Sequence, residues 1–192
     1  MTKRVVMIVA LATVLLGAAC GGSGPHSAAS GIAHDRASAP ATLTALLDPF
    51  RLQIQRWSID PLDAHHPQYE LSIYSRPAST QTADQYAGRF APLAAAVIPA
   101  VFAKYPDIAW VDLCQELAHT PSNDWEPEPV TRIEITRKAA AAIDWSHVTT
   151  ADLLARNMAD SDNVQVETHS GVAQTALWKA AAARIRAHTK GG

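Results

Sequence analysis

The sequence predicts an α+β domain, in which a mixed or antiparallel sheet of about four to five strands carries helices on one side. Several short segments alternate apolar with polar residues, which is the two-residue period of a half-buried strand. One long segment between them repeats apolar residues every three or four positions, which is the period of an amphipathic helix. The expected order is strand, strand, helix, strand, strand, helix, short strand, helix, within a single domain at residues 42–190.

Two strands open the predicted domain. Residues 50–59 (FRLQIQRWSI) and residues 69–74 (YELSIY) both alternate apolar and polar side chains, and Pro77 closes the second segment. The polar break between them is short. Neighbouring strands with such a connection are expected to pair as an antiparallel hairpin.

The longest predicted helix begins at Thr82, with Asp84 favourably placed near its positive N-terminal end. Its apolar stripe runs on to Tyr105. Pro92 and Pro99 fall inside the stripe, and each removes a backbone donor and crowds the preceding turn. We therefore expect either a kink or two consecutive helices.

The second half of the domain contains shorter elements. Residues 108–113 (IAWVDL) and residues 131–135 have the pattern of strands. Thr149 and Asp152 form a variant capping box that opens a short helix. A short edge strand at residues 164–166 follows, and Ser170 is the expected N-cap of the last helix, in which Ala173, Leu177, Ala180 and Arg184 line one face.

Composition excludes two classes of function. The chain has 192 residues, 48% of them hydrophobic, and a formal net charge of -2, whereas a nucleic-acid-binding domain carries a basic excess. Between residues 32 and 190 the only glycines are Gly88 and Gly171. A phosphate-cradling loop needs clustered glycines, so nucleotide-binding loops of that kind are excluded and no cofactor is expected.

The N-terminus has the features of a secretory signal at residues 1–19. Lys3 and Arg4 form a short basic region, and residues 5–16 form an uncharged apolar run. A spanning helix needs roughly 20 apolar residues, so this run is too short for a comfortable permanent span. A basic flank, a short apolar core and small residues before the cleavage point are typical of a signal peptide.

The residues Gly17-Ala18-Ala19-Cys20 resemble the relaxed lipobox of bacterial lipoproteins, although Leu16 stands one place too early for the preferred pattern. This resemblance implies that Cys20 receives a diacylglycerol, that acyl chains such as palmitate hold the protein in a membrane, and that the domain lies on the extracytoplasmic face. In a cell with two membranes it implies sorting to the outer membrane. The relaxed lipobox and the alanine- and arginine-rich composition with few lysines also resemble those of lipoproteins of GC-rich bacteria such as actinobacteria. The alternative is an ordinary secretory signal cut after Ala19.

Residues 20–41 are expected to be a lipidated cysteine followed by a flexible tether. The stretch at residues 21–40 is dominated by small and polar residues, with Ile32 as its sizeable apolar side chain. Such a segment cannot bury enough surface to offset the entropy of ordering it.

Three groups of residues have the composition of chemical sites, and each also has a simpler structural interpretation. His65 and His66 are a potential metal pair, but they sit in a proline-bounded loop without further ligands at suitable spacing. Cys114 and Glu116, on one face of a strand, are expected to lie near His119, as a thiol–imidazole pair or three zinc ligands. The simpler interpretation makes Cys114 a buried, unreactive residue in an apolar environment.

The third group is Asp144, Ser146 and His147, which supply the residue types of a catalytic triad but are too close in sequence to assemble one, and more simply form a turn. Trp125 lies among carboxylates and prolines. If exposed, it is suited to a protein partner or a sugar; otherwise it fixes a long loop to the core.

The leading functional hypothesis is a lipid-anchored, non-catalytic cell-envelope protein that binds or regulates another envelope protein or a glycan, with no nucleic acid as partner and no metal required. Two alternatives remain: a secreted hydrolase that uses Cys114 and His119, and a phage- or prophage-encoded lipoprotein that blocks infection.

Overall fold

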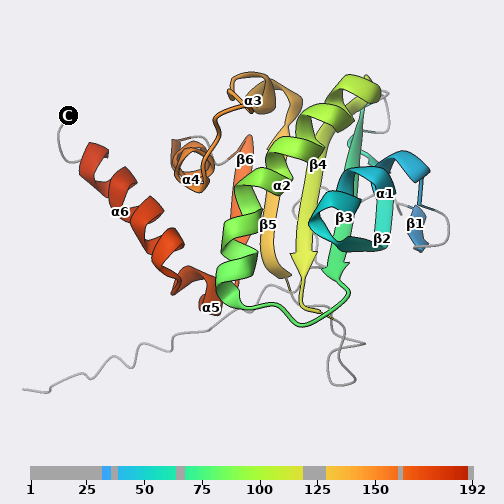
Figure 1. Ribbon diagram of the computed structural model, residues 1–192. Helices are drawn as coiled ribbons and strands as arrows, with labels where there is room; N and C mark the ends of the chain where they lie inside the picture. Colours follow the sequence, from blue (N-terminus) through green and yellow to red (C-terminus); the bar gives the residue numbers. More distant parts are fainter. Residues whose placement is uncertain (1–31, 36–38, 64–67, 119–128, 160–161, 190–192) are drawn as a thin grey trace, which may run out of the picture.

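A computed structural model describes residues 32–35, 39–63, 68–118, 129–159 and 162–189 (Figure 1). These residues form one six-stranded sheet in the order of the chain. Among these strands, β3 and β4 are the one parallel pair, and the other neighbours are antiparallel. The predicted α+β class with a mixed sheet is therefore confirmed. The strands are β1 (Ile32–Asp35), β2 (Leu52–Pro61), β3 (Tyr69–Pro77), β4 (Ile108–Glu116), β5 (Pro129–Thr136) and β6 (Val164–Thr168).

The described elements begin ahead of the predicted domain boundary at residue 42. Ile32–Asp35, inside the expected tether, forms strand β1 at the edge of the sheet, antiparallel to β2. The helix α1 (Ala41–Leu47) and the 3₁₀ turn η2 (Asp48–Phe50) then lead into β2. Four residues are too few to show a strand period, and their pairing with β2 is a contact with distant residues, so the local pattern held no sign of β1.

The helix α2 (Ala83–Lys104) begins as predicted, at a capping box. The backbone N–H of Gln85 donates to Thr82 Oγ1 over 3.3 Å, and the backbone N–H of Thr82 donates to Gln85 Oε1 over 2.8 Å. Of the two expectations at Pro92 and Pro99, two consecutive helices is wrong, because α2 is one helix of 22 residues that contains both prolines. Packing of its apolar stripe on the sheet, along nearly the whole helix, compensates for the two backbone donors that the prolines lack.

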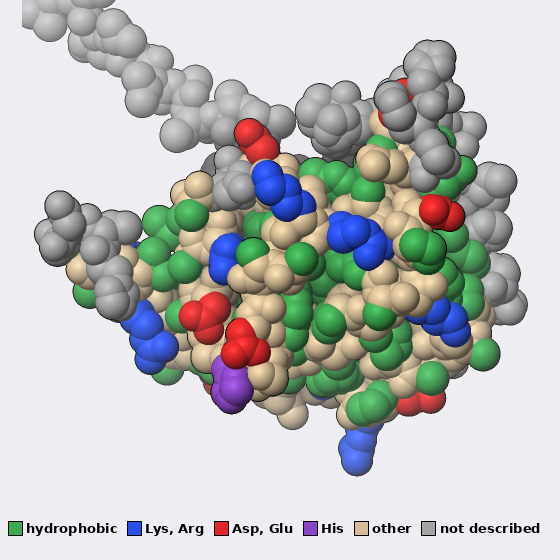
Figure 2. Space-filling model, turned by 90° about the horizontal axis from the view of Figure 1, so that it is seen from above, with side chains coloured by type: hydrophobic (Ala, Val, Ile, Leu, Met, Phe, Trp, Pro, Cys, Tyr) green, Lys and Arg blue, Asp and Glu red, His purple; other side chains and the backbone are tan. Residues whose placement is uncertain are grey.

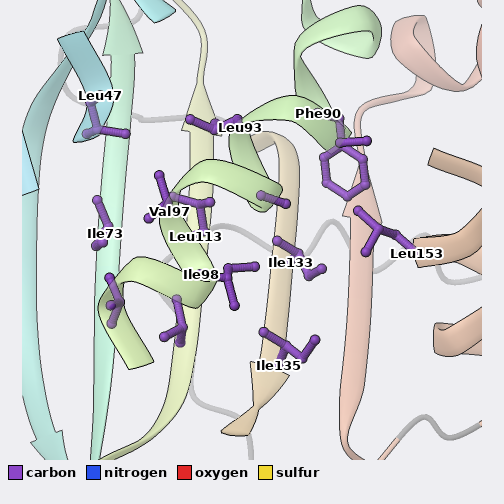
Figure 3. Packing of buried hydrophobic residues seen from close by; sticks show 14 of the residues in the cluster. Leu47, Ile73, Phe90, Leu93, Val97, Ile98, Leu113, Ile133, Ile135 and Leu153 are labelled. Atoms are coloured by element: carbon purple, nitrogen blue, oxygen red, sulfur yellow. The ribbon is translucent and has the colours of Figure 1, made fainter. Parts of the chain in front are cut away.

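The helices cover one face of the sheet. In Figure 1, α1 and α2 lie over the strands, with the C-terminal helices beside the β6 edge. Between α2 and the sheet lies the hydrophobic core, in which Ile73, Leu113 and Ile133 come from neighbouring strands and Val97 and Ile98 from the helix (Figure 3). Within the described part of the chain, α2 alone has the length and apolar character of a membrane span, but 56% of that window is buried. This degree of burial is typical of the central helix of a folded domain.

The C-terminal half packs against the β6 edge. Its capping box is confirmed: Asp152 Oδ2 accepts from the backbone N–H of Thr149 over 2.8 Å, and the N–H of Asp152 donates to Thr149 Oγ1 over 3.3 Å. This box opens α4, which buries Leu153 in the core. The helices are α3 (Arg137–Ala141), α4 (Thr150–Ala159), α5 (Ser170–Ala173) and α6 (Ala176–Thr189).

The predicted N-cap of the last helix is wrong, and the expected single helix is two, α5 and α6. His169 caps α5 by accepting from the backbone N–H of Gly171 at Nδ1, so Ser170 is already helical. A break at Thr175 separates α5 from α6 and shifts the helical phase. The inward residues of α6 are therefore Trp178, Ala181 and Ile185, whereas Leu177 is 43% exposed.

Arg137 joins the end of α2 to the start of β4. Its guanidinium donates to the carbonyl oxygens of Phe102 (2.8 Å), Tyr105 (2.6 Å), Pro106 (3.1 Å) and Ile108 (2.7 Å). These carbonyls end a helix or enter a turn, where backbone acceptors lack partners within the helix. One side chain therefore satisfies the C-terminal end of the longest helix.

Replacing Arg137 with methionine is expected to lower the free energy of unfolding by about 2–3 kcal/mol, because several partly buried carbonyls lose a charged donor at once. Arg137→Lys recovers only part of this loss, since an ammonium cannot reach the same set of acceptors. Chemical denaturation followed by circular dichroism measures both. The exposed neighbour Lys138, changed to methionine, is the control and should shift stability by no more than about 0.5 kcal/mol; an equal loss in both variants contradicts the assignment.

Candidate functional site

Several sequence-predicted site residues lie outside the described residues. These are Cys20, His65, His66, His119 and Trp125. The predicted lipidation site and the thiol–imidazole pair therefore remain predictions. Over the ranges that the structure does describe, no group of three or more His, Cys, Asp or Glu side chains is arranged to hold a metal ion.

Asp144, Ser146 and His147 lie together in one exposed turn. Ser146 Oγ donates to Asp144 Oδ1 over 2.6 Å, and His147 Nδ1 lies 2.8 Å from Ser146 Oγ and 3.0 Å from Asp144 Oδ2. Hydrogen bonds from Ser146 and His147 lower the pKa of Asp144. In a catalytic triad the two imidazole nitrogens face different partners, whereas here the same nitrogen faces both. This geometry supports the predicted turn.

Cys114 and Glu116 point to the same side of β4, as predicted. That side is the face of the sheet away from the helices, since Leu113, the residue before Cys114, belongs to the core and successive side chains of a strand point to opposite faces. Both residues are fully buried. The expected apolar surroundings of Cys114 are wrong, because its direct cross-strand neighbours are Tyr74 and Arg132. The two-residue period identified the face, but the polar neighbours depend on strand register, which the sequence does not reveal.

Native Cys114 is expected to react with a thiol reagent at least a hundredfold more slowly than in denaturant, because the residue has no exposed surface. The full chain carrying Cys20→Ala provides a single-cysteine protein for this measurement. Rapid, complete labelling of the native protein would contradict burial and would revive the hydrolase alternative.

The face of the sheet away from the helices carries an ion-pair network centred on Arg132. Its Nε and Nη2 donate to the two oxygens of Asp112 over 2.9 and 3.0 Å, and it also pairs with Glu134 and with Glu167. Burial alone lowers the pKa of Arg132, but the hydrogen bonds and charge of Asp112 outweigh it, so the net direction is upward. Asp112 is 1% exposed and also accepts from the Tyr74 hydroxyl over 3.0 Å.

A second ion pair on this face is centred on Glu116. Arg56 Nη2 lies 3.1 Å from Oε1 and Arg76 Nη2 lies 3.4 Å from Oε2. Burial raises the pKa of Glu116, against the opposing effect of the two guanidinium groups. Arg56 also stacks on the ring of Tyr74 at 3.9 Å, which connects this pair to the Asp112 network. The linked ion pairs of this face, called here the charge lattice, therefore connect side chains of neighbouring strands and stabilise the sheet.

Glu70 lies on the same face, and its side-chain pKa is raised into the neutral range. Burial, with the nearby charges of Asp112, Glu134 and Asp60, raises its pKa from 4.5 to about 7. A pKa raised by folding means that Glu70 favours the folded state below about pH 4.5 and that this contribution is lost as pH rises through 7.

Glu70→Gln is therefore expected to be more stable than the wild type at pH 8, relative to their difference at pH 4. The gain should be about 1–2 kcal/mol, since partial solvation reduces the full linkage value. Denaturation at several pH values measures it, with the exposed Asp162→Asn as control. Parallel pH profiles for wild type and Glu70→Gln would contradict the assignment.

The concave feature most suited to a small molecule is an apolar pocket beside α1, called here the α1–β2 pocket. It has a volume of about 290 Å³, close to the lower end of ligand pockets, which span roughly 300–1,000 Å³. Asp107 is the one charged residue among those described around it. Its lining residues are Pro40, Leu43, Trp57, Ile59, Tyr69, Leu71, Tyr105, Pro106, Asp107 and Ile108.

The walls of the α1–β2 pocket come from three parts of the fold: α1, the strands β2 and β3, and the turn that joins α2 to β4. The side chains of Thr42 on α1 and Tyr105 at the end of α2 share a hydrogen bond of 2.9 Å, which connects two of these walls. Ile59 is 41% exposed, although it is a large apolar side chain. On the end of the domain seen in Figure 2, hydrophobic side chains occupy much of the surface between separate basic and acidic ones.

In comparisons with known proteins, the chain matches no protein-family model, no curated protein and no solved structure. The candidate sites therefore rest on their own geometry. Most of the charged groups described on the far face are in ion pairs with one another, whereas the α1–β2 pocket combines apolar walls with the exposed side chain of Ile59. Of the two, the pocket is the better binding site.

Proposed function

We propose that this protein is a lipid-anchored, extracytoplasmic module that binds a small apolar ligand without transforming it. The observation that carries the proposal is the N-terminal sequence, in which basic residues, a short apolar run and Gly17-Ala18-Ala19 lead directly to Cys20. The first described strand starts at Ile32, twelve residues after Cys20, so a short stretch of sequence separates the predicted anchor from the sheet.

The α1–β2 pocket supports the binding half of the proposal. Its apolar lining is suited to a hydrophobic group, and burial of such a group contributes about 25 cal/mol for each Å² removed from water. A catalytic role is less well supported, because Cys114 is buried and the Asp144 turn has the wrong geometry for a triad.

Protease treatment of intact spheroplasts tests the proposed location of the full chain. The protein is expected to sediment with membranes, to resist extraction by high salt and alkaline buffer, and to be degraded by added protease without cell lysis. A cytoplasmic protein in the same sample is the control and should stay intact. Protection of the protein until lysis, or its release by salt alone, would contradict the proposal.

A further inference from the structure

The α1–β2 pocket lies at the side of the domain where the N-terminal segment enters. Strand β1, the first described element, pairs along β2 so that Ile32 is opposite Ile59 and His34 is opposite Trp57. Ile59 and Trp57 both line the pocket. The chain that leads from Cys20 therefore joins the sheet directly beside this pocket.

Covalent geometry limits how far the pocket can be from the predicted anchor. Twelve residue steps separate Cys20 from Ile32, and an extended chain covers at most about 3.6 Å for each step, or roughly 43 Å in total. This limit is similar to the full thickness of a bilayer, about 40–45 Å. An anchored domain consequently keeps the pocket within one bilayer thickness of the lipid surface.

We propose that the α1–β2 pocket binds one acyl chain of a bilayer lipid, drawn from the membrane to which Cys20 anchors the protein; this inference rests on the proposed function. The lining presents aliphatic and aromatic side chains with a single carboxylate, Asp107, which gives a neutral hydrocarbon chain apolar contact and offers a polar ligand few partners. The volume of about 290 Å³ suits a segment of one chain and not a folded partner. Acyl chains are also the apolar groups that an anchored domain meets at the highest local concentration.

Ile59 is the large apolar side chain of this site that is exposed, so a charge there should exclude the chain. Leu177 on α6 is an equally exposed apolar residue, 43% against 41%, and it is not among the residues that line the pocket. Ile59→Glu and Leu177→Glu are therefore a matched pair, which changes charge and exposed apolar area equally at two separate places.

The acylated full-length mature protein is reconstituted in phosphatidylcholine vesicles that contain a trace of lipid with a photoactivatable diazirine at the middle of one acyl chain. After illumination, crosslinks are mapped by peptide mass spectrometry. Crosslinks are expected in peptides that contain lining residues such as Leu43 and Tyr105, and Ile59→Glu should reduce them at least fivefold. Leu177→Glu should leave them within twofold, and the same lipid with the diazirine in its headgroup should not label the pocket.

Competition keeps the test independent of how well Ile59→Glu folds. Unlabelled hexadecanoic acid should reduce the crosslinks of the unaltered protein, and glycerol phosphate, which has no chain, should not. Absent pocket crosslinks on protein that co-floats with the vesicles would overturn the acyl-chain assignment while leaving the anchor intact. If the acylated protein in vesicles shows no pocket crosslinks but soluble Cys20→Ala is labelled there by diazirine-bearing hexadecanoic acid in solution, the pocket would be assigned to the protein's own acyl chains. Protein that does not co-float with the vesicles at all would instead contradict the proposed function.

Discussion

Changing Cys20 to alanine is expected to move the protein almost completely from the detergent-rich phase to the aqueous phase in a temperature-induced phase partition. A lipobox cysteine carries a diacylglycerol, and each buried methylene contributes about 0.8 kcal/mol to membrane binding. One acyl chain gives only marginal binding, whereas two or more hold a protein durably, so the partition ratio should change by about a hundredfold or more. The domain itself should fold unchanged, because Cys20 lies outside the described elements, the first of which is β1 at Ile32–Asp35.

Cys114 provides the matched control for this substitution. It is the second of the two cysteines in the chain and is buried in the sheet, so Cys114→Ala should leave the partition unaltered. Equal partition of the wild type and Cys20→Ala into the aqueous phase would contradict the anchor and would favour the ordinary secretory signal.

Arg132→Met is expected to cause the largest loss of stability on the charged face of the sheet, about 3–5 kcal/mol. The substitution leaves the carboxylate of Asp112, which is 1% exposed, with the Tyr74 hydroxyl as its remaining side-chain hydrogen bond among those found here. It also leaves Glu134 without its paired cation. The cost arises from a buried charge that has lost its partner, more than from the net contribution of the intact pair.

A second substitution tests that reason. Asp112→Asn added to Arg132→Met removes the buried charge, so the double variant should recover at least half of the lost free energy of unfolding in urea denaturation. Arg184→Met on the exposed surface of α6 is the control and should change stability by no more than about 0.5 kcal/mol. A double variant that is no more stable than Arg132→Met would contradict the charge-based account.

The local sequence pattern predicts most of the helices and strands. It fails where contacts between residues far apart in the sequence determine the structure. The strands β2 to β5 alternate clearly because one face of each packs on the helices, and Thr82 and Thr149 marked helix starts through capping residues nearby in sequence. Strand β1 and the unbroken helix α2 were not predictable, since pairing with β2 and burial on the sheet override their weak or contrary local signals.

The candidate sites were less predictable than the fold. The two-residue period correctly put Cys114 and Glu116 on one face, but the cross-strand ion pairs of that face depend on a register that joins residues 20 to 60 positions apart, from Arg132 and Asp112 to Arg56 and Glu116. The α1–β2 pocket is lined by residues from Pro40 to Ile108, so no local motif could reveal it. The alternation of β2 predicts that Ile59 points inward. Only the folded structure shows that the helices leave this side chain partly uncovered, which indicates the pocket.

The most direct test of the account is the mass of the N-terminal peptide of the mature protein, purified from membranes of the cell that makes it. The account predicts that this peptide begins at Cys20 and carries a thioether-linked diacylglycerol, with or without a further acyl chain on its amino group. A mature peptide that begins at Cys20 with an unmodified thiol, or one that still contains residues 1–19, would contradict it.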